Sequence, residues 1–319
     1  MRAWAAFLLC AVAGVALYPY FVGRLASAGA GQRVSGYAPP THRVKSRTPT
    51  MGGILFCLLA GIAWVALDRS RTGFLVVFAI GAGAGLGALD DVANIRGLGA
   101  LGLLARQKLA AQAFIGVLLG IGLHVAGYTK QVIPGFGAPD LGWLILPIAA
   151  LAVVAASNAV NLTDGVDGLA GTCAGIALAT IWALAQHAHI TGAAIMSAAL
   201  LGGVVAFLFY NWWPARVFMG DTGSLALGCA LAVLAAEVRL LWLLPLLGAV
   251  FAAETLSVVI NVTAITRFGR RIFLASPLHH HFEQKGLREQ RLVIVFGIAA
   301  ALAALLAVWI AVPGGVGAA

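Results

Sequence analysis

The hydrophobic residues of this chain form long continuous runs that are separated by short polar segments. A membrane-spanning α-helix needs about 20 mostly apolar residues, whereas the strands of a membrane β-barrel show short alternating segments. The runs therefore predict an all-α polytopic membrane protein with a single integral membrane domain over residues 1–319. Ten helices are predicted, over residues 3–22, 51–67, 73–89, 109–127, 142–160, 169–187, 193–210, 223–236, 240–264 and 292–312.

Three of these runs are irregular. The first follows Arg2 as the apolar part of a signal peptide would, but it ends in the aromatic "YPYF" without a small-residue cleavage motif. We therefore interpret it as the first membrane helix. The eighth run is short, and the ninth is long with Pro245 near its start. That proline predicts a tilt or a break in the ninth helix.

Basic residues are distributed unevenly between the loops. Fifteen of the twenty Lys and Arg residues lie in the odd-numbered loops, counted in chain order. Loops rich in Lys and Arg face the cytoplasm. The bias predicts cytoplasmic odd loops and both termini outside.

Composition supports the membrane interpretation, because only 10% of the residues are charged and 61% are hydrophobic. A soluble domain has about 25% charged residues. The net charge of +9 is accounted for by topology and anionic partners, and with no basic stripe on a soluble domain we expect no nucleic-acid partner. The four cysteines lie singly in apolar runs and are predicted to be inert core thiols.

The polar motifs all fall on the predicted cytoplasmic side, although they are far apart in the sequence. They are "KSRTPTMGG" (45–53), "LDDVANIRG" (89–97), "NAVNLTDGVDGLAG" (158–171), "VFMGDTGS" (217–224) and "SPLHHHFEQKG" (276–286). Scattered structural polar residues would not sort to one face. The motifs therefore predict a single cytoplasmic active site.

Acidic residues dominate these motifs and favour a cation site. Carboxylates at a membrane face are costly unless they are paired, hydrated or bound to a cation, and Mg²⁺ takes one or two carboxylates together with substrate phosphates. A lone aspartate at a helix end is often a cap, but a pair that closes a helix opposes the helix dipole. Six of the eleven acids lie in the motifs: Asp90, Asp91, Asp164, Asp167, Asp221 and Glu283.

The spacing of Asn161, Asp164 and Asp167 has two interpretations. Residues three apart lie on one side of a helical turn, where they could share a ligand. The same residues also fit a glycine-rich turn that leads into the sixth helix with an aspartate as its N-cap. The spacing leaves both open.

Other polar positions are equally open. Phe218 fits stacking on a flat base or anchoring at the membrane interface. Lys45 and Lys108 fit phosphate neutralisation or topology, and topology is the better explanation for most basic residues here. Glu254 lies inside the ninth run, where an acid is either functional or hydrogen-bonded to a neighbouring helix.

The three consecutive histidines of residues 279–281 are neither a terminal tag nor a typical metal site. The run is internal and is followed by a full apolar run. Adjacent side chains do not readily converge on one ion, and Mg²⁺ prefers oxygen ligands. We interpret the run as a cytoplasmic substrate-facing loop whose imidazoles donate to phosphate or sugar oxygens.

Six motifs in fixed order carry a resemblance to a known family. They are "TPTMGG", "LDD", "NAVNLTDGVDGLAG", "FMGDTGSLALG", "ETLSVVI" and "SPLHHHFEQKG". Over about residues 40–290 the chain closely resembles the bacterial phospho-N-acetylmuramoyl-pentapeptide transferases of peptidoglycan synthesis. They are a branch of the polyprenyl-phosphate N-acetylhexosamine-1-phosphate transferase superfamily. The acidic motifs are typical of the superfamily, and "SPLHHHFE" of this branch.

The resemblance implies an activity. The expected reaction moves phospho-MurNAc-pentapeptide from UDP-MurNAc-pentapeptide to undecaprenyl phosphate, giving lipid I and UMP. It implies Mg²⁺ as the cofactor, a membrane lipid as the acceptor, a location in the cell inner membrane, and a homodimer. The nearest alternative is a polyprenyl-phosphate N-acetylglucosamine-1-phosphate transferase. A membrane transporter is the alternative of another class, and acids gathered at one face disfavour it because transporters bind near the midplane.

The resemblance also implies roles for individual residues. Asp221 corresponds to the Mg²⁺ carboxylate, with Asn161 as a second ligand, and Asp90 and Asp91 correspond to the essential catalytic pair. Lys108 corresponds to a lysine near the phosphates. The implied nucleotide pocket is lined by Lys45, Thr50, Asn161, Asp164, Asp167 and Phe218, and His279 and His280 are implied to hold substrate.

Three positions depart from the family pattern. Asn94 stands where a lysine is expected, Arg47 where glycine is usual, and Asn261 where glutamine is usual. None of these departures removes an acid. They are expected to alter affinity rather than chemistry.

Overall fold

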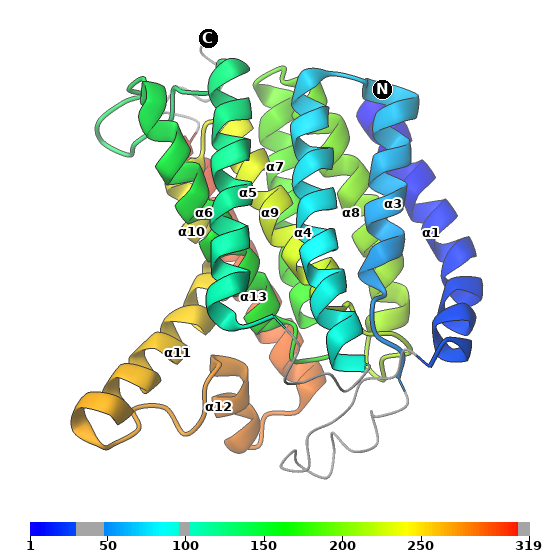
Figure 1. Ribbon diagram of the computed structural model, residues 1–319, viewed down its shortest axis with the longest axis vertical. Coiled ribbons are helices and arrows are strands. Elements are labelled where there is room, and N and C mark those ends of the chain that lie inside the picture. Colours follow the sequence, from blue (N-terminus) through cyan, green and yellow to red (C-terminus); the bar gives the residue numbers. More distant parts are fainter. Residues whose placement is uncertain (30–47, 96–102, 312–319) are drawn as a thin grey trace.

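The chain folds into a bundle of helices, as a computed structural model that describes residues 1–29, 48–95 and 103–311 shows (Figure 1). Within that part no strand is formed, and only two isolated backbone bridges occur, both in residues 130–140. The all-α prediction is therefore confirmed. The α-helices are α1 (Arg2–Ser27), α3 (Gly53–Ala63), α4 (Arg71–Ile95), α5 (Ala105–Val125), α6 (Ile145–Thr163), α7 (Leu169–His187), α8 (Thr191–Asn211), α9 (Gly220–Glu237), α10 (Leu244–Leu247), α11 (Ala249–Phe268), α12 (Leu278–Gln284) and α13 (Glu289–Ala311).

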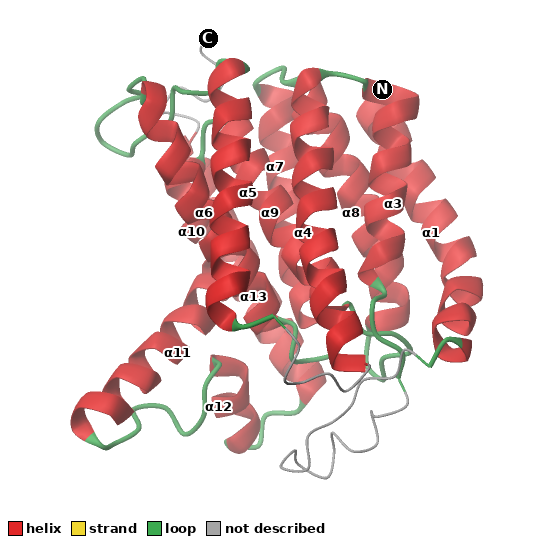
Figure 2. Cartoon of the chain, viewed as in Figure 1, coloured by secondary structure: helices red, strands yellow, loops and turns green. Residues whose placement is uncertain are grey.

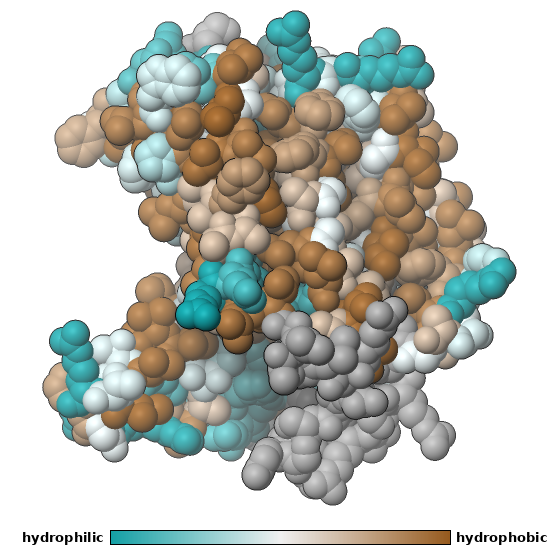
Figure 3. Space-filling view, in the orientation of Figure 1, coloured by the Kyte–Doolittle hydropathy of each residue, from teal (hydrophilic) through white to brown (hydrophobic). Residues whose placement is uncertain are grey.

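A membrane-spanning bundle is evident from helix length and surface hydropathy. Eight helical segments of the described chain are long and apolar enough to cross a bilayer. The surface shows a broad apolar band with polar residues gathered toward the two ends (Figure 3). The chain is thus a polytopic membrane protein, as the hydrophobic runs predict.

Two of the ten predicted helices fall outside that set of eight. One is α3, which continues through the π-helical turn Trp64–Asp68 and remains shorter than a typical span. The other is α9, in which every residue from Thr222 to Glu237 is buried. Helix α9 packs against α4 and α6 and lies inside the bundle. Its apolar run therefore reflects protein packing more than lipid contact.

The predicted ninth helix, residues 240–264, is broken. Residues Leu241–Leu243 form a 3₁₀ turn, α10 is a single turn with Pro245 at its start, and the long helix α11 begins only at Ala249. Gly248, which separates α10 from α11, has a backbone conformation (φ −106°, ψ 39°) outside the helical range. The prediction of a break was correct, and the span itself is shifted toward the C-terminus by the 3₁₀ turn and α10.

The polar motifs lie at one end of this bundle. In Figure 1 the N-terminus is at the top, whereas α4 ends and α5 begins at the bottom. Helix α11 leans away from the bundle at that lower end, and the short α12 lies beneath it (Figures 1 and 2). The candidate site lies at this lower end, where α4 and α6 end and α5 and α9 begin.

Candidate active site

The centre of the site is the first turn of α9, which three other helices approach. Gly87 brings α4 very close, because a Cβ at that position would lie 2.2 Å from the backbone carbonyl oxygen of Asp221. Gly220 begins α9 with a positive φ of 75°, a conformation that side-chain-bearing residues rarely adopt. A Cβ there would lie 2.7 Å from Asp91 Oδ2 and 2.8 Å from Thr50 Oγ1. The glycines therefore allow acids of two helices to meet at one point.

Asp91 caps α9 rather than its own helix. Its Oδ1 accepts the backbone N–H of Asp221 at 3.1 Å, and its Oδ2 accepts the backbone N–H of Thr222 at 2.9 Å and the Thr222 hydroxyl at 2.6 Å. The first N–H groups of a helix have no partner within that helix, and a carboxylate there also faces the positive end of the dipole. This contact explains how an acid near the C-terminal end of α4 is stabilised.

Asp90 and Asp221 are bridged by Lys108. The ammonium of Lys108, in the first turn of α5, donates to Asp90 Oδ2 at 3.1 Å and to Asp221 Oδ2 at 2.5 Å. The side chains of Lys108 and Asp90 are each 16% exposed, and that of Asp221 is 23% exposed. One cation therefore offsets the repulsion between two partly buried carboxylates at the end of the bundle that holds the polar motifs.

Asn161 connects the end of α6 to the same carboxylate. Its Nδ2 donates to Asp221 Oδ1 at 2.8 Å and to the Ser224 hydroxyl at 2.9 Å. The structure therefore brings together Asp90, Asp91, Lys108 and Asn161 around Asp221. All five were predicted as site residues from the sequence.

The segment after Asn161 is a turn that leads into α7. Helix α6 ends at Thr163, and Gly168, with φ of 83°, is the residue that precedes α7. The glycine-rich-turn interpretation is therefore correct, although the N-cap of α7 is Gly168 rather than an aspartate. Asp167 is buried and accepts the backbone N–H of Ala215 at 3.0 Å, which ties the turn to the loop that precedes α9.

Asp164 lies at the end of α6 and adds negative charge to the site. Burial raises the pKa of its carboxyl well above the usual range, and the charges of Asp221, Asp91 and Asp167 raise this pKa further. This direction is the one expected where several acids gather at one place, and a nearby positive charge would lower the pKa of Asp164 again.

The backbone around Thr50 is hydrogen-bonded to the backbone of Phe218. The backbone N–H of Phe218 donates to the Pro49 carbonyl at 2.8 Å, and the Phe218 carbonyl accepts from the N–H of Gly52 at 2.8 Å. Thr50 is buried and Phe218 is half-buried. These contacts place the "TPTMGG" motif against the loop that enters α9. Lys45, a predicted site residue, lies outside the described residues.

The histidines are divided between the interior and the surface. His279, at the start of α12, is 1% exposed, and its backbone N–H donates to both carboxylate oxygens of Glu254, at 3.1 and 3.2 Å. The His280 side chain is 38% exposed, and its Nδ1 lies 2.7 Å from Glu283 Oε2 on the same helix. Their predicted contact with substrate stays a prediction. The described contacts of His279 with Glu254 lie in the interior of the protein.

Sequence reasoning missed Asn211, the last residue of α8. It is buried, accepts the backbone N–H of Gly168 at 2.9 Å and donates to the Val217 carbonyl at 2.8 Å. It thereby joins the turn before α7 to the loop before α9. The available signal was a lone asparagine that closes an apolar run six residues before the motif "VFMGDTGS".

Known proteins are similar to this chain over almost its whole length. Residues 73–239 match the model of the family described as glycosyl transferase family 4, a segment that contains the central acids. The chain is 41% identical to the phospho-N-acetylmuramoyl-pentapeptide-transferases of Shouchella clausii and Halalkalibacterium halodurans, over 96% of this chain and 96% of each relative. It is also 41% identical to that of Heliobacterium modesticaldum, over 97% of both chains. This chain belongs to the phospho-N-acetylmuramoyl-pentapeptide transferase family.

The donor set of this transferase fits a magnesium ion. Mg²⁺ prefers oxygen ligands and is usually held by one or two carboxylates together with substrate phosphates. Asp221 and Asp90 supply carboxylates, and the Asn161 side chain also carries an amide oxygen. The Lys108 ammonium lies between both carboxylates and shows that the position favours positive charge.

Two of the positions that depart from the family pattern are described. Asn261 of α11 accepts the N–H groups of Ile272 and Phe273, at 3.1 and 2.9 Å, and donates to the Phe273 carbonyl at 3.1 Å. It therefore fixes the segment between α11 and α12. Asn94 is exposed in the last turn of α4, and Arg47 lies outside the described residues.

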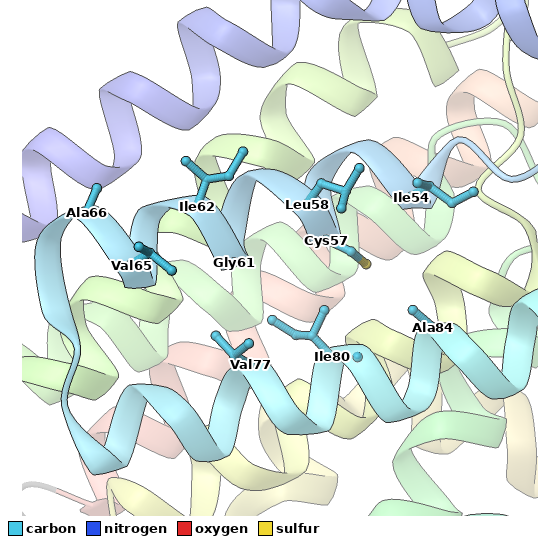
Figure 4. Close-up of a pocket in the computed structure, with 11 residues that line it drawn as sticks. Ile54, Cys57, Leu58, Gly61, Ile62, Val65, Ala66, Val77, Ile80 and Ala84 are labelled. Atoms are coloured by element: carbon cyan, nitrogen blue, oxygen red, sulfur yellow. The ribbon is translucent and has the colours of Figure 1, made fainter.

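An apolar groove of about 580 Å³ lies between α3 and α4 (Figure 4). Residues such as Leu58 and Ile62 line it from α3, and Val77 and Ile80 line it from α4. Figure 4 shows these side chains along the gap between the two helices. No charged residue is among those that line the groove.

Proposed function

We propose that this protein transfers phospho-MurNAc-pentapeptide from UDP-MurNAc-pentapeptide to undecaprenyl phosphate, releasing UMP and forming lipid I. The observation that carries the proposal is the 41% identity to transferases of that name over almost the whole chain. The site supplies acids, an amide and a lysine in one place, which suits a substrate with two linked phosphates. The same proposal includes an inner-membrane location, a cytoplasmic site and a homodimer.

Phosphoryl transfer depends mostly on positioning and charge stabilisation. In the proposed reaction an oxygen of the lipid phosphate attacks the sugar-linked phosphorus of the UDP carrier. The phosphorus–oxygen bond to UMP then breaks, and UMP leaves with that bonding pair. Asp221, with Asn161 and Asp90 beside it, would hold Mg²⁺, which would supply charge neutralisation to the pyrophosphate.

The residues of the chain have separate tasks in this proposal. Lys108 is placed to donate to phosphate oxygens from its position between Asp90 and Asp221. A phosphate monoester loses its second proton with a pKa of about 6, so the lipid phosphate gains little from a general base. Asp90 therefore orients the acceptor or shares the metal. Asp91 acts on the geometry of α9 through its hydrogen bonds.

The proposed function is tested by measuring UMP release from purified protein. The assay contains polyprenyl phosphate and Mg²⁺ with either UDP-MurNAc-pentapeptide or UDP-N-acetylglucosamine. We expect UMP with the first nucleotide only. Absence of UMP with UDP-MurNAc-pentapeptide would overturn the proposal, and release with UDP-N-acetylglucosamine alone would assign the other branch.

Asp221→Asn tests the role of the central carboxylate in the same assay. The substitution removes one charge but keeps the size of the side chain. We expect turnover to fall at least about 1,000-fold, because a metal ligand that stabilises the transferring phosphate is lost. The melting temperature in detergent should stay near that of the unsubstituted protein. Retained turnover would contradict a metal role for Asp221.

A further inference from the structure

Glu254 is a fully buried acid in a membrane helix that the proposed reaction does not use. It is 0% exposed and lies in α11, one of the eight candidate spans. Such an acid is costly in a membrane protein unless it is paired, and it usually marks a functional element. Its carboxylate accepts the backbone N–H of His279 with both oxygens, and His279 Nδ1 lies 3.2 Å from Oε1. Glu254 thus anchors the start of α12.

Asn261 anchors the preceding segment of chain from the same helix. It lies seven residues after Glu254, which is two helical turns and therefore the same face of α11. Its side chain binds the backbone of Ile272 and Phe273. Helix α11 therefore fixes both the segment after it and the start of α12 by polar side chains.

The opposite edge of His279 faces the turn that follows α6. A Cβ at Gly165 would lie 2.7 Å from His279 Nε2 and 3.0 Å from its Cε1. Gly165 is exposed and stands beside Asp164, and Nε2 has no hydrogen-bond partner among the described residues. The imidazole therefore fills the space between the carboxylate of α11 and the backbone of the turn.

We infer that Glu254 and His279 form a buried latch that positions the turn of residues 164–168, so that His279 is a positioning residue rather than a contact to substrate. The latch consists of the Glu254 carboxylate, the His279 backbone N–H and imidazole, and the Gly165 backbone. Its effect on the reaction rests on the proposed function, because the turn is a predicted part of the nucleotide pocket. Because the start of α12 contacts both α11 and the turn, a displacement of α11 would also displace the turn and Asp164.

The contact between His279 and Gly165 is tested by a double-mutant cycle in the UMP assay. Gly165→Ala places a methyl group against the imidazole, and we expect kcat/KM to fall about tenfold. In the His279→Ser background the imidazole is absent, so the same substitution should cost less than about twofold. Gly165 is exposed, and the melting temperature in detergent checks that the substitution leaves folding intact. An equal penalty in both backgrounds would overturn the latch.

The anchor is tested by comparing Glu254→Gln with Glu254→Leu. Glutamine keeps an oxygen that accepts the His279 N–H, and kcat and both KM values should stay within about threefold of the unsubstituted protein. Leucine leaves that N–H without a partner, and the KM for the nucleotide sugar should rise at least about tenfold while the KM for the lipid phosphate is unchanged. Thr255→Val is the matched control, because the Thr255 hydroxyl donates to the Phe251 carbonyl of the same helix. An unchanged nucleotide KM in Glu254→Leu, or an equal rise in both KM values, would refute the anchor.

A readout without activity separates this inference from the proposed function. We expect trypsin to cleave after Lys285 at least about fivefold faster in Glu254→Leu than in Thr255→Val, because α12 is released. If the protein releases no UMP at all, the proposed function fails and the cleavage rates alone decide the latch. Equal cleavage rates would then overturn it.

Discussion

The two adjacent acids of "LDD" contribute to the site in different ways. Asp91 accepts three hydrogen bonds from the first turn of α9, whereas Asp90 accepts a hydrogen bond from the Lys108 ammonium. Adjacent residues of a helix point about 100° apart, so each meets a different neighbour. We therefore expect Asp91 to stabilise the structure and Asp90 to act in the reaction.

Substitution of the pair distinguishes these roles. Asp91→Ala should reduce stability by about 2 kcal/mol, because a helix cap and charged hydrogen bonds are lost, and this appears as a lower melting temperature in detergent. Asp90→Asn should leave the melting temperature unchanged and abolish UMP release. Equal melting temperatures for both variants would show that the cap contributes nothing to stability.

Lys108 competes with a metal ion for the same carboxylates. Lys108→Met should therefore bind Mn²⁺, used as a spectroscopic substitute for Mg²⁺, about fivefold more tightly in the absence of substrate. Turnover should nevertheless fall at least about 100-fold, because the donor to the phosphates is lost. Arg106→Met is the control, since Arg106 is exposed in the same helical turn. Weaker Mn²⁺ binding in Lys108→Met would argue that the lysine supports the metal.

At the scale of elements, the crossing of α4 and α9 determines where the acids meet. Gly87→Ala introduces a methyl group 2.2 Å from the Asp221 carbonyl oxygen, and the two helices must separate. Overpacking of this kind costs about 1–3 kcal/mol, and we expect kcat to fall about 30-fold as Asp91 withdraws from α9. Gly85→Ala, two residues earlier, meets nothing within 4 Å and should behave like the unsubstituted protein. Equal activity of the two variants would contradict the geometric role.

Hydrophobic runs predicted most of these elements but few of their contacts. Each of the ten runs contains a helix, because apolar runs of this length have one stable form in a bilayer. The gathering of Asp90, Asn161 and Asp221 at one end also followed from their places at run boundaries. The capping of α9 by Asp91 and the burial of His279 depend on which helices pack together, which no local pattern specifies. The ninth helix is shifted by the 3₁₀ turn and α10, and α11 begins only after Gly248, a residue that ordinary membrane helices tolerate.

For the whole molecule, the distribution of Lys and Arg between the loops predicts one orientation in the membrane. Arg270 and Arg271 follow α11 at the end of the bundle that holds the acids, and Lys130 lies in the loop between α5 and α6 at the other end. We expect trypsin to cleave after Arg270 or Arg271 only in inverted vesicles, and after Lys130 only in right-side-out vesicles or spheroplasts. Mass spectrometry of the fragments gives the result. Cleavage of the two loops from the same side would disprove the arrangement.

Helix α9 also has a consequence for how the protein is made. It is enclosed by other helices, begins with Asp221 at its second residue and ends with Glu237. Carboxylates weaken the partitioning of a nascent segment from the translocon into lipid, and the alanines and glycines of α9 offer little compensation. We therefore expect its insertion during synthesis to depend on the preceding span α8, so that the order in which segments leave the ribosome becomes part of building the site.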